Sequence, residues 1–401
     1  MKKVKLMNFK QLFIATLLMV GIICLQSCTK KWSWVIEPRF DDAEEFYEGA
    51  ARVQLDGKYG YIDKSGAWII EPQFDKANEF ENGMAVVVRD DKIGLINQAG
   101  AFIAEPQFSS IGEFSEGCRA VQLNHQWGYI DSNGQWLLQP QFSYAGKFSD
   151  GIAFVERNVS VAGFIAGFID KTGNWYLPLN DSLRNYRVYE ASFHDGLYPV
   201  SKYYKIGFID KSGKLVIPCQ FFDAGSFSDG MVKIRQDNKC GYVDKNGVII
   251  VQPQFDKTAD FIDGIARVKL NDKYGFIDKS GAFIAEPQFD EAWDFSNGLA
   301  LVKRKDEKYG YIDKSGKWVI EPKFGIANPF SDELAIVVSD GKTGYINKTG
   351  EWVISPDNDN MHLIMIRDFD DEYKSKLKGD FKEGLAARIK NGKWGYISIK
   401  N

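Results

Sequence analysis

The sequence contains little histidine and little cysteine, with 3 and 5 residues in a chain of 401. His125, His194 and His362 lie far apart, and no His-x-x-x-His or Cys-x-x-Cys spacing occurs. Zinc sites rely on such spacings, so we expect no metal site. A nucleophile elbow and a phosphate-binding glycine loop are also missing. We therefore expect no catalytic residue, no cofactor and no enzymatic activity.

An excess of positive charge is missing as well. Residues 1–27 contain four lysines and no acid, so the remainder has 46 basic and 54 acidic side chains. A nucleic-acid-binding protein needs a basic patch, and we expect no nucleic-acid partner. Hydrophobic residues make up 44% of the chain, enough to form a buried core.

Long apolar runs are confined to one segment near the N-terminus. Lysines at positions 2 to 10 precede the apolar stretch Leu12–Leu25, which is too short for a spanning helix and is typical of a signal peptide. The residues Leu25-Gln26-Ser27-Cys28 resemble a bacterial lipoprotein signal, although Gln26 stands where a small residue is commonest. This resemblance implies that residues 1–27 are removed and that Cys28 is lipidated.

A lipidated Cys28 would carry more than one acyl chain, which is enough for stable membrane anchoring. Thr29 and Lys30 follow it, without the aspartate of an inner-membrane retention signal. We therefore expect an envelope protein on the outer membrane, with residues 28–33 as its tether and residues 34–401 as the folded part.

Three cysteines remain after the signal: Cys118, Cys219 and Cys240. An odd number in an oxidising compartment leaves at least one thiol free or paired with another molecule. A bridge between Cys219 and Cys240 is one alternative, because they lie in adjacent repeats. Three small buried hydrophobic side chains are the other.

A repeat of about 34 residues organises the rest of the chain. Each copy starts with glycine, an aromatic or aliphatic residue, Ile or Val, and Asp or Asn, and most successive copies are 34 residues apart. Such persistence indicates one tandem array. The ten copies begin at Gly60, Gly94, Gly128, Gly167, Gly207, Gly241, Gly275, Gly310, Gly344 and Gly395.

Each repeat contains a β-hairpin signal. Two β-rich runs surround the turn Asp313–Gly316, in which aspartate opens the turn and glycine takes the positive φ. Proline then ends the second run, and an alternating third run follows a connector with two phenylalanines, so we expect three strands per repeat. The repeated aspartate is explained by bonding to its own turn rather than by a calcium ladder.

The repeat resembles the bacterial WG-repeat family. The match rests on the sequence GYIDKSGKWVIEP from Gly310 to Pro322 and on its relatives across the mature chain. The Trp-Gly pair itself occurs only at Trp127-Gly128 and Trp394-Gly395. The resemblance implies an all-β repeat scaffold of envelope or secreted proteins, and it implies no particular ligand.

The two ends of the array are out of phase. The chain enters at the second strand of a unit, Trp34–Pro38, and stops at the first strand of another, Gly395–Ile399. Propellers usually have 4 to 8 four-stranded blades, which ten three-stranded units do not match. We therefore favour an open or superhelical array of antiparallel hairpins, with a closed propeller-like ring as the alternative.

Two kinds of binding function fit such an array. The first is a non-catalytic scaffold that binds a protein partner of the envelope, with recognition concentrated in the three insertions 157–166, 179–193 and 357–380. The second is a glycan or peptidoglycan-binding module. For the second, the candidate residues are tryptophans that recur at one repeat position and offer rings for sugars: Trp68, Trp136, Trp318 and Trp352.

Replacing Cys28 by Ala tests the anchor. We expect the variant to move from the membrane to the soluble periplasmic fraction, because the mature chain has no other apolar stretch of about 18 residues. Fractionation followed by immunoblotting measures this. A processed variant that stays with the membrane would refute lipid anchoring.

Overall fold

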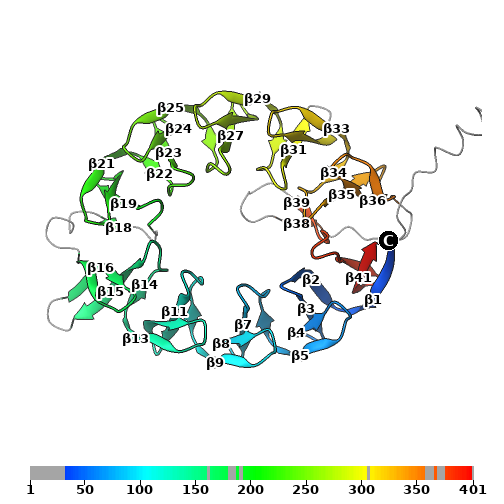
Figure 1. The fold of residues 1–401 in the computed structure, drawn as a ribbon, viewed down its shortest axis with the longest axis horizontal. Coiled ribbons are helices and arrows are strands. Elements are labelled where there is room, and N and C mark those ends of the chain that lie inside the picture. Colours follow the sequence, from blue (N-terminus) through cyan, green and yellow to red (C-terminus); the bar gives the residue numbers. More distant parts are fainter. Residues whose placement is uncertain are drawn as a thin grey trace, which may run out of the picture.

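The computed structural model describes residues 32–159, 163–178, 187–188, 193–304, 308–356, 365–367 and 375–399. All regular secondary structure in these residues is β-strand. The strands form small antiparallel sheets that follow one another around a closed ring (Figure 1). The all-β tandem-repeat prediction is confirmed.

One sheet, or blade, corresponds to one repeat. The first contains β2 (Asp42–Tyr47), β3 (Ala50–Leu55), β4 (Lys58–Asp63) and β5 (Trp68–Phe74), paired in that order. The strand of the β5 type lies on the outer circumference, and the strand of the β2 type lies toward the centre (Figure 1). Side chains alternate along each strand, so every blade has one face toward the preceding blade and one toward the next.

Eight more blades repeat this order. The second to fifth contain β6 (Lys76–Ala77), β7 (Met84–Arg89), β8 (Lys92–Asn97) and β9 (Phe102–Phe108); β10 (Ser110–Ile111), β11 (Cys118–Leu123), β12 (Gln126–Asp131) and β13 (Trp136–Phe142); β14 (Tyr144–Ala145), β15 (Ile152–Val159), β16 (Gly163–Asp170) and β17 (Trp175–Pro178); and β18 (Arg187–Val188), β19 (Leu197–Lys202), β20 (Lys205–Asp210) and β21 (Leu215–Phe221). The sixth to ninth contain β22 (Asp223–Ala224), β23 (Met231–Gln236), β24 (Lys239–Asp244) and β25 (Ile249–Phe255); β26 (Lys257–Thr258), β27 (Ile265–Leu270), β28 (Lys273–Asp278) and β29 (Phe283–Phe289); β30 (Glu291–Ala292), β31 (Leu299–Arg304), β32 (Lys308–Asp313) and β33 (Trp318–Phe324); and β34 (Ile326–Ala327), β35 (Leu334–Ser339), β36 (Lys342–Asn347) and β37 (Trp352–Ile354).

The blades therefore have four strands, where the sequence predicted three. The additional strand is the innermost one, and in most blades it has only two residues, as in β6. It pairs with the next strand through Lys76 opposite Val88 and Ala77 opposite Val87. Two residues show no periodicity, which is why the pattern assigned them to the connector.

Both ends of the chain build the tenth blade. β1 (Trp32–Phe40) pairs with β41 (Lys393–Ile399), which in turn pairs with β40 (Ala386–Lys390). The structure thus has the closed ring, the alternative arrangement, and not the open array that we favoured. The phase difference between the two ends of the sequence supplies complementary strands of one sheet.

Polar contacts reinforce this closure between the first and tenth blades. The Lys378 ammonium, which is almost fully buried, lies 2.7 Å from a carboxylate oxygen of Asp42 and 3.0 Å from one of Glu44. The Tyr396 hydroxyl donates to the backbone carbonyl of Glu44 at 2.6 Å. These contacts join the C-terminal part of the tenth blade to β2 of the first blade.

The same tyrosine bond recurs between other blades. Tyr61 is fully buried, and its hydroxyl donates to the carbonyl of Asn78 in the next blade at 2.6 Å. Buried polar groups need such partners, so each hydroxyl fixes the connector of its neighbour. The other pairs are Tyr129–Gly146, Tyr242–Ala259, Tyr311–Asn328 and Tyr345–Gly379.

The insertions differ in how far the structure describes them. The first only lengthens a hairpin, because Asn158 pairs with Phe164 and Val159 with Gly163 in β15 and β16. The third contains a small hairpin of β38 (Met365–Arg367) and β39 (Ser375–Leu377). Most of the second and third insertions lies outside the described residues, so partner recognition there stays a prediction.

The glycine that begins each repeat is required by close packing. A Cβ on Gly310 would lie 2.6 Å from the Ile320 carbonyl oxygen and 2.8 Å from the Pro322 nitrogen. The cause is a bulge in β33, since Tyr309 pairs with Phe324 whereas Tyr311 pairs with Ile320. The bulge presses the backbone of β33 onto β32, and only glycine leaves room for it.

Replacing Gly310 by Ala should destabilise the ring by about 1–3 kcal/mol, because the new methyl group overpacks against backbone. Urea unfolding followed by tryptophan fluorescence measures the change. Gly112→Ala is the matched control, because its Cβ would meet its nearest neighbours, atoms of Ala120, at 3.5 Å, an ordinary contact. Equal losses in the two variants would contradict the steric explanation.

Candidate functional site

The four tryptophans predicted as sugar platforms lie half-buried between blades. Each packs edge-on against a phenylalanine of the preceding blade, at centroid distances of 5.6 to 6.1 Å. These contacts give the rings a packing role that needs no ligand. Sugar stacking on their accessible edges stays a prediction. The pairs are Trp68–Phe40, Trp136–Phe108, Trp318–Phe289 and Trp352–Phe324.

The cysteines form no disulfide in the structure. Cys118 is buried, Cys219 and Cys240 are half-buried, and all three are free thiols. Burial raises the pKa of the Cys118 and Cys219 thiols, which makes them poor nucleophiles. The structure thus lacks the Cys219–Cys240 bridge, and of the three predicted buried side chains only Cys118 is buried. Cys28 lies outside the described residues.

The repeated aspartates bond to their own turns. One carboxylate oxygen of Asp313 accepts the N–H groups of Ser315 at 2.8 Å and Lys317 at 3.1 Å, and also the Ser315 hydroxyl. Asn347 accepts the equivalent bonds from Thr349 and Glu351. The turn interpretation is therefore confirmed. Among the described residues, no three His, Cys, Asp or Glu side chains gather as a metal site.

These hydrogen bonds lower the pKa of the aspartates that open the turns. Chiefly the neighbouring hydroxyl, and also backbone N–H groups, hold the aspartate pKa below its ordinary value. The affected residues are Asp63, Asp170, Asp210, Asp278 and Asp313.

The ring should therefore lose stability in acid. A carboxyl whose pKa is lower in the folded than in the unfolded chain stabilises the fold above the unfolded pKa of about 3.9, and this contribution disappears as the pH falls through the folded pKa. Urea unfolding at pH 7, 5, 4 and 3 measures it. Asp313→Asn should stay folded, as Asn347 shows, and should have a smaller acid loss; unchanged stability between pH 5 and 3 would contradict the assignment.

Lysines of the same turns form ion pairs with the preceding blade. Lys279 lies 2.6 Å from Asp229, and Lys171 lies 3.2 Å from Glu116. The acids also accept backbone bonds from the neighbouring blade, as Asp229 does from Gly264. These pairs are exposed and repeat around the ring, so each contributes little and none defines a site.

One position in each repeat, beside the cleft between its blade and the next, is occupied by a different residue type in most blades. It lies on the second strand, directly opposite the residue that follows the repeat glycine, and its side chain faces the next blade. We call it the cleft position. From the first blade to the tenth it is occupied by Arg52, Val86, Ala120, Phe154, Pro199, Lys233, Arg267, Leu301, Ile336 and Ala387.

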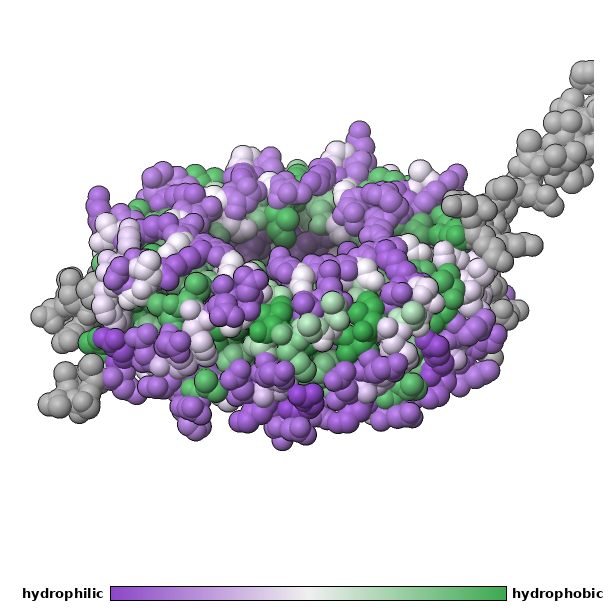
Figure 2. All heavy atoms as spheres, turned by 60° about the horizontal axis from the view of Figure 1, so that its bottom comes forward, coloured by the Kyte–Doolittle hydropathy of each residue, from purple (hydrophilic) through white to green (hydrophobic). Residues whose placement is uncertain are grey.

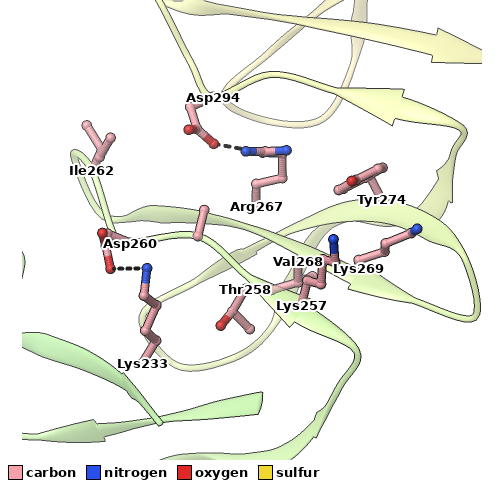
Figure 3. Close-up of a pocket in the computed structure, with 11 residues that line it drawn as sticks. Lys233, Lys257, Thr258, Asp260, Ile262, Arg267, Val268, Lys269, Tyr274 and Asp294 are labelled. Carbon is pink, nitrogen blue, oxygen red and sulfur yellow. Dashed lines mark hydrogen bonds and ion pairs between the residues drawn. The ribbon is translucent and has the colours of Figure 1, made fainter. Parts of the chain in front are cut away.

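Charged residues at this position line a cavity of 340 Å³ between the sixth, seventh and eighth blades (Figure 3). Lys233 pairs with Asp260 of the next blade at 3.2 Å, and Arg267 pairs with Asp294 of the following one at 2.9 Å. Lys257 adds a further positive charge beside them (Figure 3).

A second cavity of 270 Å³ adjoins the first and shares Lys233, Lys257 and Thr258 with it. Counting Lys269, four basic and two acidic side chains line the first cavity. Its described lining contains no histidine, serine or cysteine. The excess of basic side chains suits recognition of a negatively charged group.

The outer wall is apolar in every blade. Figure 2 shows a hydrophobic belt between two hydrophilic rims and a hollow at the centre of the ring. One apolar residue near the start of each outermost strand contributes to this belt, for example Val35, Leu137 and Val319, which are 40–44% exposed. Because the belt repeats with the blades, it marks no single site. In the described residues, no helix is long and apolar enough to cross a membrane.

The closed ring of repeated four-stranded sheets defines the class of the protein as a β-propeller-like repeat protein. The chain belongs to the WG containing repeat family. Nine segments match the family model: residues 33–59, 59–92, 93–124, 127–158, 206–240, 241–274, 274–309, 309–342 and 344–361. The prediction of the family from the repeat motif is thus confirmed.

Solved structures similar to this chain have low sequence identity. A eukaryotic initiation factor is 10% identical at a TM-score of 0.43, over 79% of this chain and 87% of that one. Hsv2p from Kluyveromyces lactis is 8% identical at a TM-score of 0.33, over 67% and 97% of the chains. YCF48 bound to D1 peptide is 12% identical at 0.29, over 61% and 94%. None of the curated proteins matches this chain in sequence.

Proposed function

We propose that this protein is a non-catalytic binding scaffold of the bacterial cell envelope. Its inter-blade clefts engage a protein partner, and a lipid on Cys28 holds it on the outer membrane. Repeat rings of this kind generally act as protein-interaction scaffolds.

The proposal rests on a difference between positions that hold the same residue in nearly all blades and the cleft position, which does not. The repeat glycine and the turn acid or amide recur around the ring because the fold needs them. The cleft position has no such requirement, and it holds arginine, lysine, phenylalanine, leucine and alanine in different blades. Six of its ten occupants are buried, but Arg52, Val86, Lys233 and Arg267 are partly exposed. The clefts of these blades therefore offer different side chains, which one asymmetric partner can recognise in one orientation.

The charges of the sixth to eighth blades support an acidic segment on the partner. Lys233 and Arg267 are each held in place by an acid of the next blade, so little side-chain entropy is lost when a partner binds. Lys257 has no ion pair among the described residues and is exposed. A carboxylate of a partner would find a fixed cationic surface there.

The length of the tether sets how near to the membrane the ring would lie. The first residue of β1, Trp32, is four positions after Cys28, and an extended chain spans at most about 3.6 Å per residue. The outer rim of the tenth blade would therefore lie within roughly 15 Å of the lipid. A scaffold held so closely would meet partners at the membrane surface.

The glycan-binding alternative is favoured by one observation only. Trp68, Trp136, Trp318 and Trp352 are half-buried rather than fully buried, so a part of each ring is accessible. Their positions around the outer half of each blade would suit a long polymer rather than a compact ligand. Cell-wall fragments that change the tryptophan fluorescence would support this alternative.

Capture from crosslinked envelopes tests the scaffold function. The full lipidated chain is compared with the double variant Lys233→Ala and Arg267→Ala, and we expect at least a tenfold loss of the captured protein. The control is the double variant Lys171→Ala and Lys279→Ala, which also removes two inter-blade ion pairs but leaves the clefts unchanged. An equal loss in both, with unchanged thermal unfolding, would refute binding at the clefts.

A further inference from the structure

The third blade departs from its own repeat at one buried position. The residue before the cleft position faces the preceding blade and is alanine in seven blades, for example Ala51 opposite Ile62 and Ala85 opposite Ile96. In β11 the same place, opposite Ile130, is occupied by Arg119. A long charged side chain thus stands where seven other blades have a methyl group and the remaining two have Tyr198 and Val232.

The Arg119 guanidinium has no acceptor among the described residues. The side chain is 6% exposed, its Nε has no hydrogen-bond partner, and its one close contact of note is the ring of Phe114 at 5.6 Å. Arg52 in the first blade is different, because it donates to the Ala77 carbonyl at 2.8 Å and lies 3.2 Å from Glu44.

Burying a charge without a hydrogen-bond acceptor is costly, and the nearby charge of Glu81 offsets this cost only in part, since burial is the larger effect on the Arg119 pKa. Burial also lowers the pKa of this guanidinium, although an arginine stays protonated at neutral pH. A bound anion would supply the missing acceptor.

Arg119 lines a cavity of 460 Å³ at the inner side of the first three blades. Tyr47, Phe80, Met84 and Val86 give this cavity apolar walls. Its size lies within the range of small-ligand sites, about 300–1,000 Å³. The cavity therefore combines one buried cation with room for an apolar group.

Two acids restrict which anion fits. Glu79 and Glu81 line the same cavity, and neither forms an ion pair with Arg119. They repel a phosphate, which carries up to two charges, more strongly than a carboxylate with one, and they accept N–H groups. The C-terminus of a peptide offers a carboxylate for Arg119, amide N–H donors for the two acids and an apolar side chain for the walls.

We propose that this cavity binds the C-terminus of a partner polypeptide whose last residue is apolar, with Arg119 pairing to the terminal carboxylate. The proposal rests on the scaffold function only in taking a protein as the source of the carboxylate. It concerns a different part of the ring from the cavity between the sixth and eighth blades.

Fluorescently labelled tetrapeptides test the proposal with the full chain. We expect peptides that end in free Leu or Phe to bind, and the same peptides with amidated C-termini, or ending in Asp, to bind at least tenfold more weakly. Arg119→Ala should abolish binding and at the same time raise the melting temperature, because it restores the alanine of seven other blades. Lys279→Ala is the control, because it removes an exposed inter-blade ion pair away from both cavities, and it should retain peptide binding.

Several results would overturn this assignment. A lower melting temperature for Arg119→Ala would make the arginine a structural residue. Equal binding of free and amidated peptides would exclude the carboxylate contact, and equal binding of acetyl-leucine alone would indicate a small-molecule site. If no peptide binds while the Lys233 and Arg267 variant still loses its envelope partner, the C-terminus proposal fails and the scaffold function stands.

Discussion

Each blade of this protein buries its apolar side chains only against the neighbouring blades. Ten hydrophobic clusters lie at the ten blade interfaces, and the cluster between the tenth and first blades contains Phe40, Phe46 and Tyr396 from both ends of the chain. A single repeat has no core of its own, so stability depends on the interfaces. Pairing of β1 with β41 gives the terminal blades the same neighbours as the internal ones, and closes the ring.

That dependence divides the residues into two groups. Positions that shape a blade, such as Gly310, or hold it on the next, such as the Tyr61 hydroxyl, recur because the geometry of the repeat is the same around the ring. Positions that face the clefts at the inner wall are free to differ. Where the varying residue is partly exposed, as in Arg52, Lys233 and Arg267, recognition is possible without loss of the fold.

Charged groups follow the same division. The turn lysines pair with acids at the rim in one blade after another, and these exposed pairs repeat with the fold. Arg119 has no equivalent in the other blades and no acceptor within the described residues, so the repeat gives no structural reason for it. Because the ten blades serve as controls for one another, an unexplained residue in one of them points to a ligand rather than to packing.

The sequence alone determined the period, the hairpin with its Asp-to-Gly turn, and the proline that ends the second strand, because these depend on residues close together in the chain. Ring closure, the two-residue inner strands and the packing of Trp68 against Phe40 were decided by tertiary structure. Closure joins residues more than 350 positions apart, and the pattern of one repeat contains no information on the angle between successive blades. For the same reason the sequence could not predict that Arg119 belongs to a site. Its missing acceptor and its cavity exist only where three blades meet.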